Sequence, residues 1–302
     1  MERNEQMIST EKGDSIRITR NYLDSLLVEG RIVGAVHPSS KIHLFGRSFD
    51  TPIMTGALSH LKNGMAGYAQ GAKQAGAICS IGMGSVEDLE HVLTVNRDVI
   101  KVIKPYADEQ EILSRIQAAE RLGALGVGMD VEHSINQNDD ADSEVDGYAM
   151  KLPTLEELSR YVASTGLPFF IKGALSVQDA IRCKEIGCAG VILSHHNGLM
   201  RWAVPPVMLL PDIRKAVGED FLLIADGGIQ DGYDAFKALA LGADLVCVGR
   251  PLMGPYSKEG SEGLADFINK MTGELKVMMA RTGACDLTQI APEVIHPVNW
   301  NF

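Results

Sequence analysis

Short apolar runs alternate with amphipathic stretches from about Thr51 onward, and this alternation is the feature that most restricts the fold. The runs are almost continuously apolar, which is typical of parallel strands that are covered on both faces. Eight such runs are present: Pro52–Ala57, Ala77–Ile81, Val99–Ile103, Leu125–Val131, Pro168–Gly173, Ala189–Ser194, Phe221–Asp226 and Leu245–Gly249. Strands and helices that alternate eight times predict a closed (β/α)8 TIM barrel, rather than an open doubly wound sheet.

The stretches between the apolar runs carry signals for the start and end of helices. Ser85 and Thr154 each open a capping-box pattern, and Ser176 can cap a helix that continues to Lys184. Glycine closes four predicted helices just before the next strand, at Gly76, Gly123, Gly187 and Gly242. These signals support the alternation of strands and helices.

The first fifty residues precede the repeating pattern. A barrel takes about 250 residues, so a chain of 302 residues leaves about fifty for extensions. We find no internal boundary and expect one domain over residues 1–302, with residues 1–50 as an N-terminal extension. Within the extension, Tyr22–Val28 is a candidate helix that plugs or flanks the bottom of the barrel.

Composition and charge favour a protein that acts on a small molecule. The net charge of −11, without basic runs, argues against nucleic acid as the main partner. No apolar run approaches the roughly 20 residues that span a bilayer, and Met1–Arg17 has no apolar signal segment. We therefore expect a cytoplasmic protein with no membrane partner. The five cysteines lack a metal-ligand spacing, so we expect them to pack in the core and expect no metal.

Two segments interrupt the regular pattern. Glu132–Lys151 is a long polar loop after the fourth strand, on the catalytic face of a barrel, and is either a mobile lid or a plain solvated loop. Its acidic stretch, Asn136–Glu144, does not match a calcium-loop spacing. The tail Pro297–Phe302 carries aromatic residues that either dock on a neighbouring subunit or pack on their own barrel.

Two glycine turns follow the last two predicted strands. One is Asp226-Gly227-Gly228 and the other is Gly249-Arg250, with a predicted helix, Tyr233–Leu241, between them. Glycine lets backbone N–H groups approach an anion closely, and a helix N-terminus adds the positive end of its dipole. Since the loops after strands 7 and 8 are the usual phosphate site of a barrel, the turns predict a phosphate-bearing ligand.

Polar residues at the carboxyl ends of the strands are the candidates for catalysis. Lys172 ends an apolar strand, where a cation is expected to face an anion or an electron-rich ring. The adjacent His195 and His196 must point in different directions, and Asp130 is available to orient one imidazole and stabilise its protonated form. Further candidates at strand ends are Ser80, Lys104, Ser194 and Asp226.

Taken together, these motifs resemble the FMN-dependent 2-hydroxy-acid oxidases and dehydrogenases, the family of glycolate oxidase and lactate oxidase. The resemblance runs from about Thr51 to Ile295. Leu167–Gly173 resembles the family's lysine strand, and Ser194–Gly198 resembles its Ser-Asn-His-Gly catalytic motif. The segment Ala225–Pro251 is similar to its flavin phosphate signature.

The resemblance implies a function and a set of residue roles. It implies oxidation of a lactate-like, glycolate-like or larger 2-hydroxy acid to the 2-oxo acid, with transfer to flavin N5, by a homo-oligomer (tetramer or octamer). His196 would be the base, Asp130 would stabilise its imidazolium, and Lys172 would lie beside flavin N1 and the C2 carbonyl. The other implied flavin contacts are Thr55, Gly56, Ala57, Ser80, Ser194, Asp226, Gly227, Gly228, Gly249 and Arg250.

The chain departs from the family where the substrate carboxylate binds. The arginine expected three residues after the catalytic histidine is Leu199, and residues 131–151 contain no arginine. A charge-assisted hydrogen bond contributes about 1.5–3 kcal/mol, so losing two costs roughly a hundredfold to ten-thousandfold in affinity. The family's strand 3 motif, which supplies a glutamine and a tyrosine, is replaced around Lys101–Tyr106, where Lys104 or Tyr106 is the candidate substitute. The substrate contacts that we expect are Lys104, His196 and Arg201.

Two alternative functions stay open at this point. Type 2 isopentenyl diphosphate isomerase resembles the same flavin barrel, but needs cations that Lys104 and Arg201 supply only in part. A flavin-binding protein without a substrate site would explain the missing arginines. The retained set of Asp130, Lys172 and His196 favours an enzyme.

Overall fold

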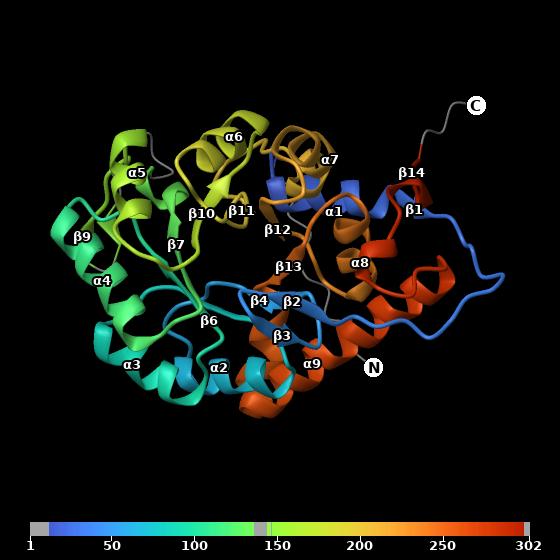
Figure 1. Cartoon of the computed structure of the whole chain (residues 1–302), viewed down its shortest axis with the longest axis horizontal. Helices are drawn as coiled ribbons and strands as arrows, with labels where there is room; N and C mark the ends of the chain where they lie inside the picture. Colours follow the sequence, from blue (N-terminus) through green and yellow to red (C-terminus); the bar gives the residue numbers. More distant parts are fainter. Residues whose placement is uncertain (1–11, 136–143, 146, 299–302) are drawn as a thin grey trace.

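An eight-stranded parallel sheet forms the centre of the computed structural model, which describes residues 12–135, 144–145 and 147–298 (Figure 1). Its strand order is β4-β13-β12-β11-β10-β7-β6-β5. The strands are β4 Ile53–Thr55, β5 Cys79–Ile81, β6 Val99–Ile103, β7 Gly126–Asp130, β10 Phe169–Ala174, β11 Gly190–Leu193, β12 Leu222–Asp226 and β13 Leu245–Val248. Each strand overlaps one of the eight predicted apolar runs.

Hydrogen bonds between β4 and β5 close the sheet into a barrel. Thr55 donates its backbone N–H to the Ile78 carbonyl (3.2 Å), and its hydroxyl accepts from the Ser80 backbone N–H (2.8 Å). Leu58 and Ile81 add a parallel bridge. Buried side chains fill the interior, so the barrel is a packed core. They include Met54, Ile78, Ile100, Val102, Phe170, Ile192, Ile224 and Cys247.

Helices surround the sheet and begin and end largely where the sequence predicts. They are α2 Met65–Gln74, α3 Val86–Val95, α4 Glu109–Leu122, α5 Leu155–Ala163, α6 Val177–Glu185, α7 Pro206–Val217, α8 Gly232–Ala240 and α9 Met253–Arg281. Ser85 and Thr154 form capping boxes, and Ser176 caps α6. The four closing glycines all have a positive φ. None of the helices in the described ranges has the length and apolar character to cross a bilayer.

The N-terminal extension differs from the expected Tyr22–Val28 helix. Helix α1 is Ser15–Asp24, and it begins earlier because the Asp14 side chain accepts from the first backbone N–H groups of the helix. Leu26–Val28 is instead a strand, β1, paired antiparallel with β14, Ile295–Pro297. The first three residues of the expected helix are thus the end of α1, and the last three form β1.

The position of α1 is also different from the expected one. Its buried residues, Ser15, Thr19 and Leu23, recur every fourth position and so share one face. The Ser15 hydroxyl donates to the Met200 carbonyl and accepts from the Ala203 N–H (2.9 Å), both in the loop after β11. Helix α1 therefore covers the carboxyl end of the barrel and not its bottom.

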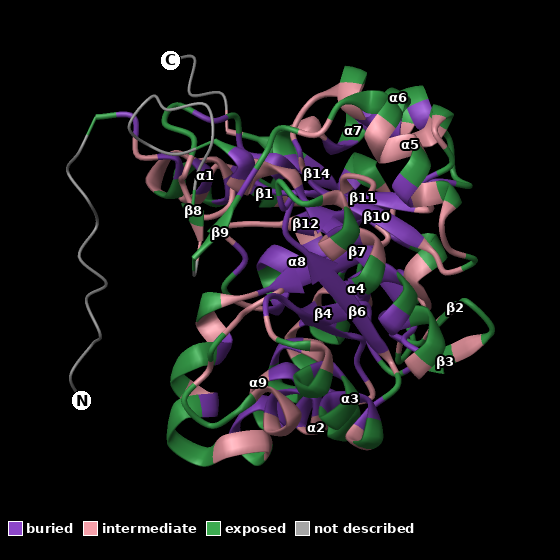
Figure 2. Cartoon of the chain, turned by 90° about the vertical axis from the view of Figure 1, so that its left-hand side faces the viewer, coloured by how far each residue is buried: buried purple, intermediate pink, exposed green. Residues whose placement is uncertain are grey.

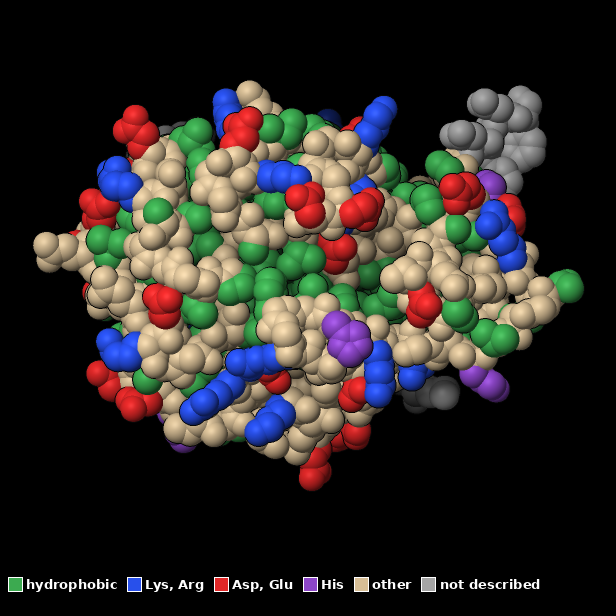
Figure 3. Space-filling view, viewed as in Figure 1, with side chains coloured by type: hydrophobic (Ala, Val, Ile, Leu, Met, Phe, Trp, Pro, Cys, Tyr) green, Lys and Arg blue, Asp and Glu red, His purple; other side chains and the backbone are tan. Residues whose placement is uncertain are grey.

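A short hairpin closes the bottom of the barrel. Its strands are β2, Ile42–Leu44, and β3, Arg47–Phe49, and Phe49 packs into the barrel interior. At the hairpin turn, Phe45 meets Phe170 edge to face, with ring centroids 6.1 Å apart. Figure 2 shows this hairpin at the opposite end of the molecule from α1. In Figure 3, which views the hairpin end from outside, charged side chains of both signs surround an area of hydrophobic ones.

The long segment after β7 contains structure of its own. It begins with a 3₁₀ turn, η1 (Val131–Ser134), and ends in a small hairpin, β8 (Glu144–Val145) and β9 (Tyr148–Ala149). Ala149 accepts a hydrogen bond from the Ala107 N–H (2.8 Å), which joins the hairpin to the segment after β6. Residues 136–143, nearly all of the acidic stretch, lie outside the described residues, and the lid stays a prediction.

The remaining elements lie near the C-terminus. They are η2 Arg250–Leu252, η3 Leu287–Gln289 and η4 Pro292–Val294. Residues 299–302 of the aromatic tail lie outside the described residues. Cys79, Cys183, Cys188 and Cys247 are buried and all five cysteines are free, which confirms the packing role predicted for most of them.

Candidate functional site

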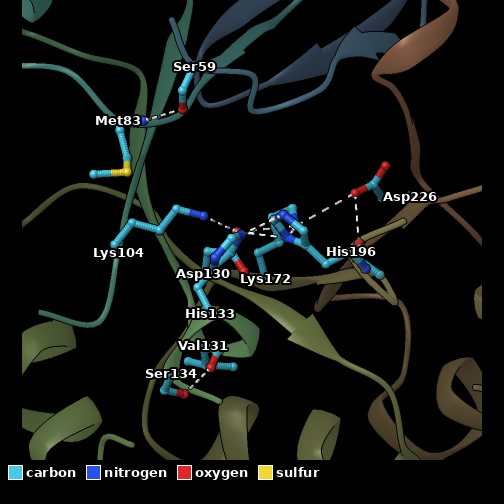
Figure 4. Close-up of polar contacts among 11 residues, drawn as sticks. Ser59, Met83, Lys104, Asp130, Val131, His133, Ser134, Lys172, His196 and Asp226 are labelled. Carbon is cyan, nitrogen blue, oxygen red and sulfur yellow. Dashed lines mark hydrogen bonds and ion pairs between the residues drawn. The ribbon is translucent and has the colours of Figure 1, made fainter. Parts of the chain in front are cut away.

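Polar side chains from four neighbouring strand ends converge on Asp130 at the end of β7 (Figure 4). Lys104, after β6, donates to Asp130 Oδ2 (2.8 Å), and Lys172 of β10 lies 3.4 Å from the same oxygen. His196, after β11, places Nδ1 3.1 Å from this oxygen and 2.8 Å from Lys172 Nζ. The structure therefore brings together four of the residues that the sequence predicts for the site.

The charges in this cluster are set by burial and by the close cations. Burial alone would raise the pKa of Asp130, but the charge of Lys172 and the hydrogen bond of His196 hold it well below its ordinary value. Burial lowers the pKa of His196 below its ordinary 6.5, and the bond to Asp130 only partly offsets this. Burial also lowers the pKa of Lys104. At neutral pH, Asp130 is ionised and His196 is a neutral imidazole that can accept a proton.

Lys172 is the cation at the centre of the site. It is 4% exposed, and its Nζ lies 3.9 Å from Asp226 Oδ2 as well as near Asp130. Burial by itself would lower the pKa of Lys172, but the charges of Asp130 and Asp226 raise it above its ordinary value. Lys172 therefore remains protonated, as a buried cation between two carboxylates.

His133 is a site residue that the sequence reasoning missed. It lies in η1, and its Nε2 is 2.6 Å from His196 Nε2, with the two rings nearly perpendicular (86°). Burial lowers the pKa of His133 to about 3, so both imidazoles are neutral at pH 7 and one donates to the other. A histidine three residues after a strand-end aspartate was the available signal.

Glu132 is a second residue that the sequence reasoning did not single out. Its Oε2 is buried and has no hydrogen-bond partner among the described residues. Burial raises the pKa of Glu132 from its ordinary 4.5 to about 8, so the carboxyl group is largely protonated at neutral pH. A neutral carboxyl next to Asp130 can donate a hydrogen bond to a ligand.

The two adjacent histidines point in different directions, as predicted. His195 is 1% exposed, with Nε2 2.8 Å from the Thr19 hydroxyl on α1, and its Nδ1 accepts from the Gly198 N–H (3.1 Å). His196 and Asn197 have φ of 44° and 57°, so the chain turns sharply after β11. This turn sends His195 toward α1 and His196 toward Asp130.

The two glycine turns lie side by side because β12 and β13 are neighbours in the sheet, with Asp226 opposite Cys247. Gly227 and Gly228 have φ of 114° and 77°, which other residues rarely adopt. A Cβ on Gly249 would meet only one atom within 4 Å, Leu58 Cδ2 at 3.8 Å, so this backbone is open to a ligand. Arg250 follows directly and is exposed.

Asp226 connects the turns to the Asp130 cluster. It accepts a hydrogen bond from the Ser194 hydroxyl (2.9 Å), and Ser194 in turn accepts from the His196 N–H (3.0 Å). The predicted phosphate turns and the predicted catalytic residues therefore belong to one continuous surface at the carboxyl end of the barrel.

Arg201 is not brought to this surface. It is exposed, and its guanidinium donates to the Lys12 carbonyl, ahead of α1. Beyond Gly198 the loop after β11 contacts the N-terminal segment on both sides of Arg201: the Met200 carbonyl accepts from the Ser15 hydroxyl, and the Trp202 N–H donates to the Gly13 carbonyl (2.9 Å). Of the two cations expected to bind substrate, the structure places Lys104 alone in the cluster.

The comparisons with known proteins decide the family. A family model described as FMN-dependent dehydrogenase matches residues 7–150 and 136–297. The chain belongs to this family. It is an FMN-dependent α-hydroxy-acid oxidase or dehydrogenase, which confirms the family, enzyme class and cofactor expected from the sequence.

Individual relatives match along most of the chain. L-lactate oxidase of Lactobacillus jensenii is 27% identical over 301 residues, covering 87% of this chain and 73% of the relative. Glycolate oxidase of Spinacia oleracea is 26% identical over 312 residues, covering 90% and 85%. A crystal structure of mandelate oxidase matches with a TM-score of 0.83 at 25% identity, covering 95% and 90%. The TIM-barrel fold is thereby confirmed.

The residues present fit FMN. Ser80 Oγ and Asp130 Oδ1 are buried polar atoms without a hydrogen-bond partner among the described residues, as atoms that face a polar ligand would be. Lys172 supplies a buried cation and Gly249 an open backbone. Thr55 uses its hydroxyl, its backbone N–H and its carbonyl in hydrogen bonds within the barrel, so a direct polar contact from Thr55 to the cofactor stays a prediction.

A metal in place of these contacts is disfavoured by charge. Asp130, His133 and His196 bring three possible ligand atoms within 4.8 Å of one another. The same Asp130 oxygen, however, lies within 3.4 Å of both Lys104 and Lys172. Two ammonium groups oppose the approach of a divalent cation. The absence of a metal stays a prediction.

Proposed function

We propose that this enzyme oxidises a 2-hydroxy acid to the 2-oxo acid, with His196 as the base. The observation that carries the proposal is a neutral imidazole 3.1 Å from an ionised, buried carboxylate and beside a buried ammonium group. Relatives named L-lactate oxidase and glycolate oxidase, and a neighbouring structure named mandelate oxidase, support this substrate class.

Each residue of the cluster has a proposed part in the reaction. FMN supplies the two-electron acceptor. His196 removes a proton from the substrate, and Asp130 stabilises the imidazolium that results. Lys172 would supply a positive charge beside the flavin ring and so favour its reduction. Because Lys172 is already buried and paired, this charge needs little reorganisation during the reaction.

The proposed cofactor contacts follow the surface from the turns to the cluster. Gly227, Gly228, Gly249 and Arg250 hold the phosphate, where backbone N–H groups and a guanidinium suit a dianion. Asp226 and Ser194 bind the ribityl chain. Residues 55–57, Ser80 and Lys172 would hold the flavin ring.

Lys104 is the proposed contact for the substrate carboxylate. Its ammonium group donates a hydrogen bond to Asp130 (2.8 Å), which also contacts the proposed base, His196. With Leu199 in place of one arginine and no arginine in residues 131–151, Lys104 supplies the positive charge that such a substrate needs. A diphosphate needs more cations, and Arg201 lies elsewhere, which weakens the case for an isomerase.

The experiment is anaerobic reduction of the bound flavin in His196→Ala, with His195→Gln as the matched control. General-base catalysis contributes about 10²–10⁴-fold, so His196→Ala should bind FMN yet reduce it at least about a hundredfold more slowly. His195→Gln, which alters a contact to α1, should stay within about tenfold of the wild type. Wild-type reduction rates in His196→Ala would refute the proposed base.

A further inference from the structure

Arg20 lies on α1, outside the barrel, yet its guanidinium reaches the loop after β12. Nη1 donates to the Gly228 carbonyl (2.9 Å) and to Asp234 Oδ2 (2.6 Å), and Nη2 donates to Asp234 Oδ1 (2.8 Å). Asp234 is 3% exposed, in the first turn of α8. Arg20, whose side chain is 22% exposed, therefore forms a bidentate, partly buried ion pair with Asp234 and also binds the Gly228 carbonyl of the glycine turn.

The Asp234 carboxylate also binds the backbone on the other side of the turn. Asp234 Oδ2 also accepts from the Gln230 N–H (3.0 Å). Helix α1 packs directly on the turn, because a Cβ at Gly228 would lie 2.6 Å from Thr19 Cγ2. The shape of the glycine turn is therefore fixed by contacts with the N-terminal extension as well as by the barrel.

Charge gives this contact a second consequence. The first turn of α8 carries two acidic residues, Asp231 at the N-cap and Asp234, and Gln230 just before them is uncharged. A helix N-terminus favours an anion, but neighbouring carboxylates oppose a phosphate dianion. Burial lowers the pKa of Arg20, yet its hydrogen bonds to Asp234 and Asp24 raise it above the ordinary value, so Arg20 is always charged.

We propose that Arg20 is a positioning residue for the FMN phosphate: it holds the Gly227-Gly228 turn in its binding shape and neutralises Asp234 beside it. The proposal rests on the assignment of this turn to the phosphate. Arg20 acts through Gly228 and Asp234 and does not itself touch the phosphate. The N-terminal extension is thereby part of the cofactor site.

The test compares FMN with riboflavin, which has the same ring and ribityl chain but no phosphate. Apoprotein is titrated with each flavin and the dissociation constants are read from flavin fluorescence. Since charge-assisted contacts are at stake, Arg20→Gln should weaken FMN binding by about ten- to a hundredfold. Riboflavin binding should change by less than about threefold. An equal loss for both flavins, or no loss for FMN, would overturn the proposal.

A matched control distinguishes an effect on the glycine turn from a general loosening of the contact between α1 and the barrel. Lys237 of α8 donates to the Leu23 carbonyl (2.7 Å), a second bond between α8 and α1 that does not involve the turn. Lys237 also interacts electrostatically with Asp234 and Asp231 but donates to Leu23 and not to the turn, so Lys237→Met should shift the ratio of the two dissociation constants much less than Arg20→Gln. A ratio shifted as far as in Arg20→Gln would mean that any loosening of α1 has the effect, and would refute a specific role for Arg20.

Two further variants keep the result decisive. Arg20→Lys retains the charge but not the two-pronged geometry, and should lose FMN affinity by less than Arg20→Gln. If Arg20→Gln does not fold, the ratio of the FMN and riboflavin dissociation constants is measured for Arg20→Lys instead, and a ratio equal to that of the wild type would refute the proposal. Asp234→Asn in the Arg20→Gln background should restore part of the FMN affinity, because it removes the uncompensated carboxylate. Failure of the wild type to bind FMN would instead refute the cofactor assignment.

Discussion

Replacing Asp130 with asparagine is the most informative perturbation of the buried cluster. Asparagine has nearly the same shape but no charge, so Lys104 and Lys172 would be left without their shared counter-ion. Their side chains are 8% and 5% exposed, and that of Asp130 is 2% exposed, so water cannot replace the lost partner. We expect Asp130→Asn to destabilise the flavin-free protein strongly.

The expected size of this loss follows from the burial. Removing one partner of a buried ion pair costs about 3–5 kcal/mol. Unfolding entropy is about 2.1 cal/mol/K per residue, or about 0.6 kcal/mol/K for 302 residues. The melting temperature should therefore fall by about 5–8 °C. Because the pKa of Asp130 is depressed, its stabilisation is fully present above the unfolded-state pKa and is lost as the pH falls through the folded-state value. The difference between wild type and variant should thus persist from pH 7 to pH 5.

Thermal unfolding followed by circular dichroism measures this difference, with Asp130→Asn/Lys104→Met as the paired variant. In Asp130→Asn, Lys172 still has Asp226 at 3.9 Å, whereas Lys104 has lost its ion-pair partner, so removing Lys104 should make the double variant more stable than Asp130→Asn alone. It should still reduce flavin slowly, since the imidazolium has lost its carboxylate. A melting temperature for Asp130→Asn within about 1 °C of the wild type would refute the buried ion network.

Two more predictions concern the residues around this cluster. The pKa of Glu132 is about 8 in the folded protein, against an ordinary 4.5. Between these pH values the folded state keeps a proton that the unfolded state has lost, so the free energy of unfolding should fall as the pH rises from 4.5 to 8. Glu132→Gln should flatten the melting temperature between pH 5 and 8, and an unchanged slope would contradict the assignment. Thr19→Val removes the 2.8 Å hydrogen bond to His195 and should lower the free energy of unfolding, measured in urea, by about 1 kcal/mol. FMN affinity should also fall, because α1 is held less firmly. A urea midpoint equal to that of the wild type would show that this bond is not stabilising.

Much of the barrel could be predicted because its strands are covered on both faces. A run such as Val99–Ile103 is apolar throughout and is a strand over the same residues in the structure. The capping boxes at Ser85 and Thr154 depend on neighbouring residues alone, so local sequence is enough to find them. The convergence of Asp130, Lys172 and His196 follows once the strands are placed in a parallel sheet.

Other features depend on contacts that local sequence does not encode. Helix α1 buries the small polar residues Ser15 and Thr19 together with Leu23, so apolar residues alone do not mark its docking face. His133 reaches His196 only because η1 turns directly after β7. Arg201 leaves the site because the loop after β11 contains several residues with positive φ, a conformation that the residue types do not announce.

The measurement that tests the central claim most directly is an anaerobic visible spectrum of the purified protein before and after a mixture of short and aromatic 2-hydroxy acids. We expect an oxidised flavin spectrum that bleaches on addition of the mixture. A flavin that stays oxidised with a saturating mixture, but is still bleached by dithionite, would contradict the proposed substrate class while leaving the cofactor site in place.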